Sequence, residues 1–435
     1  MPDALALPQM TAAPTTIQIM AAPLPSFSEA ARIVYDCASG LLQTPLRREL
    51  VSLDAAAGRI LAHSVCADRD MPAFPRSTRD GYSVRAAEAS HHHWFSIAGA
   101  SRAGDPPAGP LPPGSAWEIM TGAAIPSGAD AVAMLEHVQH DEGRIRLSKG
   151  RHLDPGENIV AIAAEARAGD ELIPSGALIG AAQIAAAATC GYTALQVFAR
   201  PRVAILSTGD ELVPVEALPG PGQIRNSNAS MLAALVYGAG GEPVVLPAAG
   251  DNTAAIEAAL HSARDSDLLL VSGGVSAGKF DLVEPALARL GAQFHFTGVR
   301  IQPGKPLVFG DLPRLDRSLA AIPFFGHPGN PISTAATFLL FAGPVLRALA
   351  GVRDFTPRFS AATVSREVKG KPGLTRFVPA HVACDLISGN PPEVAPVPWQ
   401  GSGDLAAFAR GNCFLVVPEA SERLRIGELA IALPI

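Results

Sequence analysis

Hydroxyl, carboxylate and glycine residues gather directly after short apolar runs of this chain. The run that ends at Leu206 continues as STGDE from Ser207 to Glu211, which brings two hydroxyls, a glycine and two carboxylates together. This mixture suits a metal-bridged phosphate or a ribose. The same residue types also form turns and helix caps, and the segment alone favours neither interpretation.

A glycine-rich loop follows the apolar run that ends near Val271. Its sequence is SGGVSAGKFD, from Ser272 to Asp281. Residues 273–279 spell G-x-x-x-x-G-K, but Phe280 stands where a P-loop needs Ser or Thr to hold Mg²⁺. We interpret the loop as a cradle of backbone amides for an oxyanion, with Asp281 a candidate for contact with metal, pterin or another ligand.

Two proline-bounded loops add further polar groups. Residues 326–331, GHPGNP, join a predicted strand to a helix, and Asn330 is a natural N-cap before Pro331. Residues 302–306, QPGKP, hold Lys305 between two prolines, which lowers the entropy cost of presenting its ammonium group. The alternative is an unpaired surface lysine.

Histidines and cysteines offer only weak metal-site patterns. Adjacent residues on an extended chain alternate in direction, so the run His91 to His93 is interpreted as a solvated loop. Five cysteines lie far apart without a C-x-x-C pair, which indicates thiols of a reducing compartment. The first 25 residues lack the basic region of a secretory signal or transit peptide, so the cytoplasm is expected.

The composition indicates a folded protein with no global attraction to polyanions. The hydrophobic fraction is 48% and the charged fraction 17%, which excludes a disordered chain. The formal net charge of -6 offers no field that attracts nucleic acid or an anionic membrane. We therefore expect neither partner, and any anionic ligand must be held by local groups.

The alternation of apolar runs and helical patterns after Pro201 predicts a central doubly wound α/β domain. In such a sheet ligands bind beyond the carboxyl ends of the strands, where the loops above lie. Strands are predicted at 203–206, 244–246, 268–271 and 320–325, and helices at 230–237, 253–263 and 282–290.

The flanking regions have different textures. Ser26 and Glu29 form a capping box that predicts a helix to about Leu41. Short apolar stretches between Pro and Gly clusters predict a β-rich module inserted before residues 151–198, and we expect that segment to pack on the first helix. After about Phe355, short strands predict a small β-barrel or sandwich. These strands are expected at 375–383, 394–399, 413–417 and 429–433.

The predicted fold is therefore a multidomain α/β and β protein with five parts. They are a flexible N-terminal tail (1–25), an elongated helical and β N-terminal domain (26–51 plus 151–199), an inserted β-rich domain (52–150), the α/β domain (200–352) and a C-terminal β-barrel (353–435).

Nine segments, in this order, resemble the molybdopterin molybdenumtransferase family, whose members include the E domain of gephyrin. They run from the PAFPRSTRDGYSVR segment to the C-terminal region, and each alone is weak. The nine are residues 72–85, 120–132, 154–158, 206–212, 272–281, 301–306, 326–331, 375–380 and 399–404.

The resemblance implies a four-domain elongated protomer and a homodimer whose active clefts are shared between subunits. It implies a central α/β domain of the molybdopterin-binding type. The implied reaction inserts molybdate into adenylylated molybdopterin with Mg²⁺ or another divalent ion, cleaves the adenylate and releases AMP. A molybdopterin adenylyltransferase and molybdenum enzymes or their chaperones are the partners such a reaction suggests.

The resemblance also implies site residues. Molybdate, a tetrahedral dianion, needs cationic and hydroxyl donors. Carboxylates beside an anionic ligand are tolerable when a cation lies between, so a divalent metal is expected on Asp210, Glu211 and Asp251. The residues implied to bind molybdate are Lys305, Arg376, Ser402 and Gln302. The implied catalytic residues are Asp210, Glu211, Asp251 and Asp281, with Asp80 and Thr121 from the other subunit. The residues implied to bind substrate are Thr208, Gly209, Ser272, Gly273, Gly274, Ser276, Pro306 and Asn330.

The chain departs from the family's pattern at several positions. Gln302 stands where many members carry Lys or Arg, which removes a positive charge from the predicted molybdate site. Val160 and Ala161 stand where paired arginines are common, and Glu165 takes the place of an aspartate. His327 replaces a common leucine; its imidazole would sense pH or pack beside Phe325, and packing is favoured.

Two other functions compete with this interpretation. The α/β domain alone also resembles molybdopterin adenylyltransferases, but those enzymes are little more than this one domain. A protein-binding scaffold of the same fold is the second, and the lost charges favour it. The retained Lys305, Arg376 and Ser402 favour the enzyme.

Overall fold

The computed structural model describes residues 23–275, 281–316, 318–384, 387 and 389–435. The expected N-terminal tail therefore lies outside the described residues except for its last three positions. The chain forms two compact units. The first contains Met1–Gln43, Pro201–Leu349 and Phe355–Ile435, and the second contains Thr44–Arg200 and Ala350–Asp354.

Helix α1 (Phe27–Leu41) begins with the predicted capping box. The Glu29 amide donates to Ser26 Oγ over 3.3 Å, and the Ser26 amide donates to Glu29 Oε2 over 2.7 Å. We predicted that this helix packs with residues 151–198. Its buried side chains, such as Ala30 and Val34, belong instead to the core of the α/β domain, because they join one apolar cluster with helix α7 (Gly343–Leu349).

The α/β domain is built on a six-stranded sheet of order β16-β13-β17-β21-β20-β18. The first four strands are parallel, and β20 and β18 continue antiparallel. The strands are β13 (Arg202–Ser207), β16 (Glu242–Val245), β17 (Leu268–Ser272), β18 (Gln293–Phe296), β20 (Val308–Leu312) and β21 (Ile322–His327). Between β13 and β16 in the sequence, β14 (Leu212–Val213) and β15 (Ile224–Arg225) form a separate two-stranded pair.

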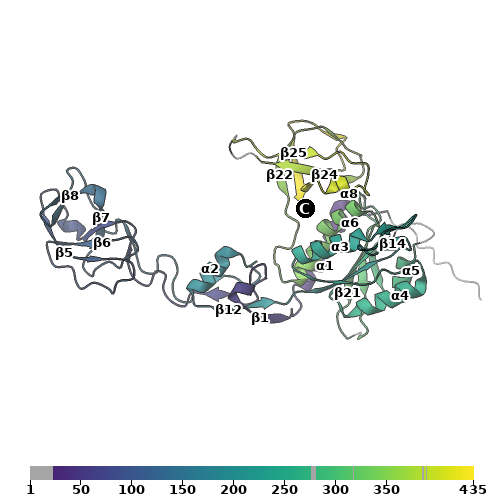
Figure 1. Cartoon of the computed structure of the whole chain (residues 1–435), viewed down its shortest axis with the longest axis horizontal. Helices are drawn as coiled ribbons and strands as arrows, with labels where there is room; N and C mark the ends of the chain where they lie inside the picture. The colour runs from purple at the N-terminus through teal and green to yellow at the C-terminus, as the bar shows by residue number, and fades with distance from the viewer. Residues whose placement is uncertain (1–22, 276–280, 317, 385–386, 388) are drawn as a thin grey trace, which may run out of the picture. The chain divides into compact units, whose positions relative to one another are not determined.

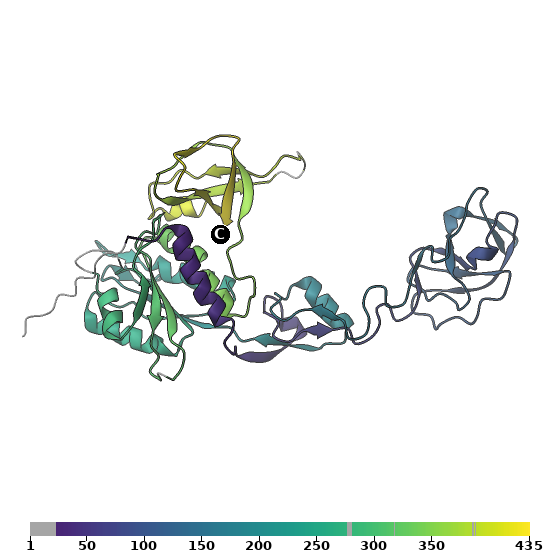
Figure 2. The ribbon, with the colours of Figure 1, turned by 180° about the vertical axis from the view of Figure 1, so that it is seen from behind.

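Alternate residues of these strands enter two different cores. Ile205 and Leu270 pack with α1, α3 (Ser227–Gly238), α6 (Pro331–Thr337) and α7. Leu206 and Val271 pack with α4 (Thr253–Ser262) and α5 (Val283–Arg289) on the opposite face. Figures 1 and 2 show the two helical layers from both sides. The predicted doubly wound domain is thereby confirmed.

One long apolar helical stretch lies inside this domain. Residues 331–349 (α6, the π-helical turn Phe338–Ala342, and α7) match a membrane span by length and composition, but most of the stretch is buried within the protein. It is therefore a core helix.

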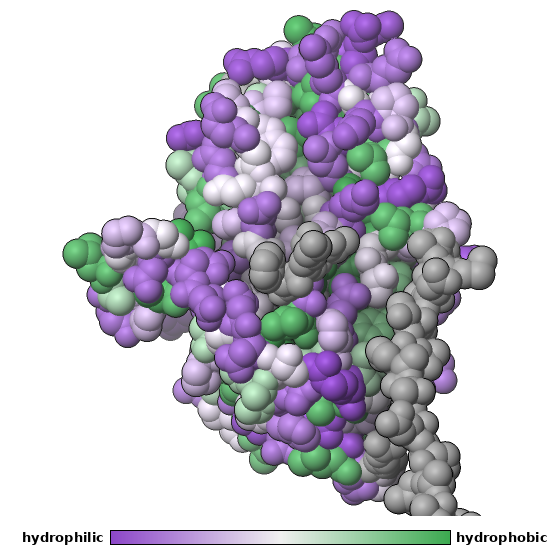
Figure 3. Space-filling view, turned by 90° about the vertical axis from the view of Figure 1, so that its right-hand side faces the viewer, coloured by the Kyte–Doolittle hydropathy of each residue, from purple (hydrophilic) through white to green (hydrophobic). Residues whose placement is uncertain are grey.

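Figure 3 shows one face of the molecule. Where grey atoms do not cover this face, hydrophilic residues predominate and apolar residues are scattered among them.

The C-terminal region forms the predicted small barrel. Strand β24 pairs with both β25 and β26, and the ring β24-β25-β22-β28-β26 closes through that second pairing. Val378, Leu415 and Val417 are among the side chains that fill it. The ring strands are β22 (Ser360–Val364), β24 (Thr375–Ala383), β25 (Glu393–Pro396), β26 (Cys413–Val417) and β28 (Leu429–Pro434); β19 (Ile301–Gln302) adds to β24, β23 (Val368–Lys369) pairs with β27 (Arg423–Leu424), and α8 (Leu405–Phe408) precedes β26.

The second unit is rich in β-structure, as predicted. Its main sheet has the order β7-β4-β6-β5-β9-β8 and encloses Phe95 and Ile145. The strands of this sheet are β4 (Gly81–Val84), β5 (Phe95–Ser101), β6 (Ser115–Ile119), β7 (Ala131–Met134), β8 (Val138–Asp141) and β9 (Arg144–Leu147). Three two-stranded pairs lie outside it: β1 (Arg48–Ser52) with β12 (Ala194–Phe198), β2 (Val65–Cys66) with β11 (Glu171–Ile173), and β3 (Arg76–Ser77) with β10 (Ile159–Val160). The unit also contains helix α2 (Ala181–Thr189).

Candidate active site

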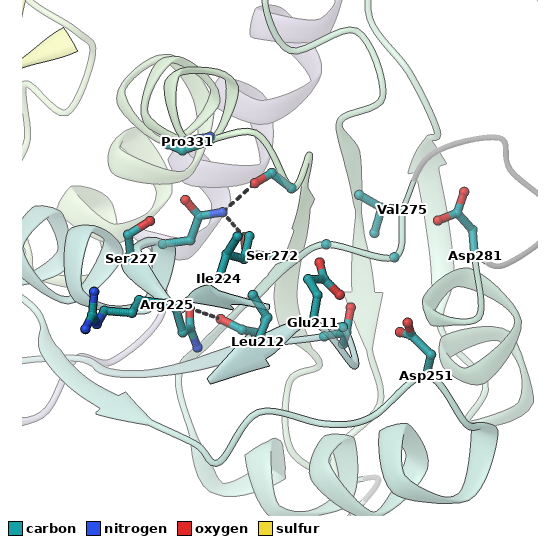
Figure 4. Close-up of a pocket in the computed structure, with 18 residues that line it drawn as sticks. Glu211, Leu212, Ile224, Arg225, Ser227, Asp251, Ser272, Val275, Asp281 and Pro331 are labelled. Atoms are coloured by element: carbon teal, nitrogen blue, oxygen red, sulfur yellow. Dashed lines mark hydrogen bonds between the residues drawn. The ribbon is translucent and has the colours of Figure 1, made fainter. Parts of the chain in front are cut away.

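A pocket of about 280 Å³ lies at the carboxyl ends of β13 and β17, where ligands bind in open α/β sheets. Figure 4 shows its lining, with Glu211, Asp251 and Asp281 in one part of the view and Ser227, Arg225 and Pro331 in another. The lining comprises Ser207, Thr208, Gly209, Glu211, Leu212, Ile224, Arg225, Asn226, Ser227, Asn228, Asp251, Ser272, Gly273, Gly274, Val275, Asp281, Gly329 and Pro331.

Two glycines let the loop after β17 approach the loop after β13. Gly273 and Gly274 have φ of +94° and +63°, a region that side chains rarely adopt. A Cβ on Gly273 would lie 2.7 Å from the Thr208 carbonyl oxygen, and one on Gly274 would lie 2.8 Å from Thr208 Oγ1. The predicted glycine-rich loop is thus a place of close backbone approach. Ser276, also predicted to contact substrate, lies outside the described residues.

Two buried polar atoms of the pocket have no partner among the described residues. They are Thr208 Oγ1 and Asn228 Oδ1. Leaving a buried polar atom unpaired costs about 1–3 kcal/mol, so both atoms are suited to meet a ligand or water. Asn228 Nδ2 donates to Ser272 Oγ (2.8 Å) and to the Gly329 carbonyl (2.7 Å), which joins two of the predicted loops.

Asn228 was missed by the sequence reasoning. The predicted helix began at Ser230, whereas α3 begins at Ser227 after the N-cap Asn226, whose side chain accepts from the Ala229 amide at 3.1 Å. The NSN segment after Arg225 carried a capping signal that could have extended the helix by a turn. Its loop-bridging partners could be found only from the fold.

Three of the four predicted carboxylates line the pocket: Glu211, Asp251 and Asp281. Asp210 is not part of the lining. Its Oδ1 accepts from the Asp251 amide (3.0 Å), and its own amide donates to Asp251 Oδ2 (3.4 Å). The Asp210 side chain therefore holds the loop that carries Asp251. The two predicted carboxylates are joined by hydrogen bonds in which the backbone amide of each residue donates to the carboxylate of the other.

The carboxylates do not form a closed metal site by themselves. Within the described ranges, no three His, Cys, Asp or Glu side chains are close enough together to hold an ion. Mg²⁺, however, is commonly bound by one or two carboxylates together with substrate phosphates and water. The oxygen donors of Glu211 and Asp251 fit that mode, and the metal assignment to Asp210, Glu211 and Asp251 stays a prediction.

Two of the predicted molybdate residues are neighbours in the first unit, and a third contacts a predicted substrate-binding residue. Gln302 of β19 is the register partner of Arg376 of β24. Asn330 Nδ2 donates to Ser402 Oγ over 2.9 Å, and Asn330 stands between two residues of the pocket lining. Lys305 is exposed, and Pro306 beside it is half-buried.

Arg376 is held in an unusual environment for a guanidinium. Its Nη1 donates to the Lys369 carbonyl, its buried Nε has no partner in the described part of the chain, and burial lowers its pKa below the ordinary value. A half-buried cation with an unused donor is well suited to an oxyanion.

In the second unit, Asp80 and Thr121 are joined by hydrogen bonds, and their predicted place in the cleft of the other subunit stays a prediction. The Thr121 amide and Oγ1 donate to Asp80 Oδ1 over 2.7 and 2.8 Å, and these bonds lower the pKa of the carboxyl. Glu165, which takes the place of an aspartate, pairs with Arg76 at 2.5 Å. Of the histidine run, His93 packs edge-on against Phe95 with ring centroids 4.5 Å apart.

His327, for which packing was favoured, is fully buried. Its ring stacks on Phe325 with centroids 6.0 Å apart, and its Nδ1 lies 2.8 Å from Thr337 Oγ1. Burial lowers the pKa of the imidazole to about 3, so the ring is neutral near neutral pH.

Fold and pocket together define a class of protein: a multidomain chain whose α/β domain has a pocket at the carboxyl ends of parallel strands, followed by a closed β-barrel. Three family models match successive parts of it. They are the MoeA N-terminal region (domain I and II) over residues 25–191, a probable molybdopterin binding domain over 204–348, and the MoeA C-terminal region (domain IV) over 361–435. The chain belongs to the MoeA family of molybdopterin molybdenumtransferases.

Curated relatives match almost end to end. The chain is 34% identical to the molybdopterin molybdenumtransferase of a Nostoc species, covering 95% of both chains. It is 33% identical to the Haemophilus influenzae protein of that name, covering 89% of this chain and 94% of that one. A crystal structure of the MoeA protein from Pyrococcus horikoshii OT3 is similar with a TM-score of 0.78 and 26% identity, over 95% of this chain and all of that chain. An adenylyltransferase made of the α/β domain alone does not account for these matches.

Proposed function

We propose that this protein is a molybdopterin molybdenumtransferase of molybdenum cofactor biosynthesis. It inserts molybdate into adenylylated molybdopterin, with divalent-metal-dependent cleavage of the adenylate and release of AMP. The curated relatives carry the name of this activity. The observation that supports it most strongly is the pocket at the carboxyl ends of β13 and β17, whose lining includes three carboxylates and two buried polar atoms without partners in the described part of the chain.

The donors suit molybdate by charge and by number. Arg376 offers an unused buried Nε, its register partner Gln302 offers an amide, and Ser402 stands one hydrogen bond from Asn330 at the pocket. Lys305 adds a mobile point charge. Together these residues would bind the tetrahedral dianion and offset its charge as oxo ligands are exchanged for the dithiolate of the pterin.

The pocket suits the adenylylated pterin. Thr208 and Asn228 would bind polar groups of this substrate through their unpaired oxygens, and the two glycines would let its phosphates come close to the backbone. A divalent ion, when bound with the substrate, would offset the charge of the pyrophosphate and so ease its cleavage. Glu211 and Asp251 would hold it, with Asp210 supporting the Asp251 loop.

We also propose a cytoplasmic homodimer. Asp80 and Thr121 belong to the second unit and would complete the cleft of the other subunit. The low pKa of Asp80 keeps its carboxylate charged above acidic pH, so it would orient a hydrogen-bond donor of the substrate.

The test is to incubate the purified protein with adenylylated molybdopterin, Mg²⁺ and molybdate, and to measure molybdenum that co-migrates with the pterin. The proposal predicts one molybdenum per pterin in the product. Pterin that binds in the pocket but stays free of molybdenum would overturn the proposal and favour a scaffold.

A further inference from the structure

The side chain of His327 reaches from the pocket sheet to helix α6. The residue ends strand β21, and its carbonyl accepts from the Gly273 amide of the glycine loop over 3.1 Å. Its side chain is 0% exposed, with Nδ1 2.8 Å from Thr337 Oγ1, and Nε2 has no partner among the described residues. One residue therefore touches the substrate loop through its backbone and helix α6 through its ring.

The direction of the hydrogen bond follows from the surroundings of Thr337. Its Oγ1 lies 2.8 Å from the Ser333 carbonyl and 3.1 Å from the Thr334 carbonyl, and its one hydrogen is donated to these carbonyls. The hydroxyl must therefore accept from His327, whose hydrogen sits on Nδ1 of a neutral ring. A pKa of about 3 for this buried imidazole is consistent with that state.

The methyl group of Thr337, Cγ2, packs against the predicted molybdate loop, residues 302–306. A Cβ on Gly304 would lie 2.6 Å from Thr337 Cγ2, so the methyl group sits directly against the Gly304 backbone. Gly304 has φ of +111° and immediately precedes Lys305. A threonine in a helix divides between two χ1 rotamers, because its hydroxyl can bond backward in either. The bond from His327 selects the one that keeps the methyl on Gly304.

We propose that His327 is a positioning residue for molybdate binding: it fixes the rotamer of Thr337, and the Thr337 methyl fixes the loop that presents Gln302 and Lys305. The molybdate part of this inference rests on the proposed function. A leucine at position 327 would pack in the same space but could not hold the hydroxyl.

The first test measures amide hydrogen exchange at Gly304 and Lys305 and needs no activity. Thr337→Ser keeps the hydroxyl and removes the methyl, and His327→Leu removes the donor. Each is expected to speed exchange there by about fivefold or more, because the loop loses its support. Thr334→Ser removes a buried methyl from the same helix, where the hydroxyl bonds to the Pro328 carbonyl at 2.6 Å, and is expected to leave Gly304 and Lys305 unchanged.

The second test separates positioning from general stability. His327→Leu should raise KM for molybdate about five- to tenfold while KM for the adenylylated pterin changes little, and His327→Asn, which keeps a donor near Nδ1, should recover part of the loss. Unchanged exchange and unchanged KM in folded variants would overturn the inference. If the unaltered protein has no molybdate-dependent turnover, the proposed function fails, and the exchange result still decides whether His327 supports the loop.

Discussion

At the scale of single residues, the proposed anion recognition would depend on donors with unused bonding capacity. The Nη1 of Arg376 donates to a backbone carbonyl, and its buried Nε has no partner in the described part of the chain. Thr208 also keeps a buried hydroxyl unpaired, whereas the unpaired Asn228 Oδ1 can only accept and would meet a hydrogen-bond donor of the substrate. Each arrangement costs stability in the free protein and is offset when a ligand supplies the missing bond.

Charge at the molybdate loop can be removed or restored. Lys305→Ala and Arg376→Ala should each raise KM for molybdate about tenfold or more, since a charge-assisted hydrogen bond is worth about 1.5–3 kcal/mol. Gln302→Lys should lower it, because it restores the cation that many family members carry. Steady-state kinetics with varied molybdate measures both. If all three variants had the same KM for molybdate as the unaltered protein, molybdate would bind elsewhere.

Several local features were predictable because they depend on a few neighbouring residues. They are the Ser26 capping box, the close approach of the glycine loop and the N-cap position of Asn330 before Pro331, although the Asn330 side chain makes no capping hydrogen bond among the described residues. The roles of Asn228 and Thr337 were not predictable. Their partners lie on other loops, and only the folded chain brings those loops together.

At the scale of elements, strands with strong apolar runs were predicted closely, and β24 and β26 have the predicted bounds. In the second unit many strands have only two to five residues, too few for a period of two to stand out. Helix α1 was predicted correctly, but its packing partner was not. An amphipathic pattern shows that one face is buried and does not show what buries it.

The cap of α1 gives a test of stability at this scale. Ser26→Ala should lower the free energy of unfolding by about 1 kcal/mol, because it removes the hydroxyl that accepts from the Glu29 amide in the capping box. Urea denaturation measures the change. Ser39→Ala, at an exposed position of the same helix, is the control and should change little. Equal losses in the two variants would contradict a role for the cap.

The contact between β21 and α6 should make stability depend on pH. The pKa of His327 falls from its ordinary value of 6.5 to about 3 on folding, so the unfolded chain binds a proton between these values that the folded chain does not. This contribution is complete above pH 6.5 and is lost as the pH falls toward 3.

Between pH 7.5 and pH 5 the loss from this one group should be about 2 kcal/mol. Urea denaturation at the two pH values should show His327→Leu to be less sensitive to acid by that amount. The exposed His63→Gln variant should keep the sensitivity of the unaltered protein. An unaltered acid response in His327→Leu would contradict the assignment of this proton to His327.

At the scale of the whole molecule, the proposed homodimer would build each active cleft from residues of both subunits. Asp80 belongs to the second unit and Asp281 to the first. If each cleft takes one residue from each subunit, Asp80→Ala and Asp281→Ala proteins should be inactive alone and partly active after subunit exchange. Half of the dimers would then be mixed, with one intact cleft each, which gives about one quarter of full activity. No recovery after verified exchange would contradict a shared cleft.

The most direct test of the central claim is AMP release from adenylylated molybdopterin in the presence of Mg²⁺, followed with and without molybdate. We predict release that depends on molybdate and that needs Lys305 and Arg376 at low molybdate concentrations. Release at the same rate without molybdate, or no release from pterin that is demonstrably bound, would contradict the account.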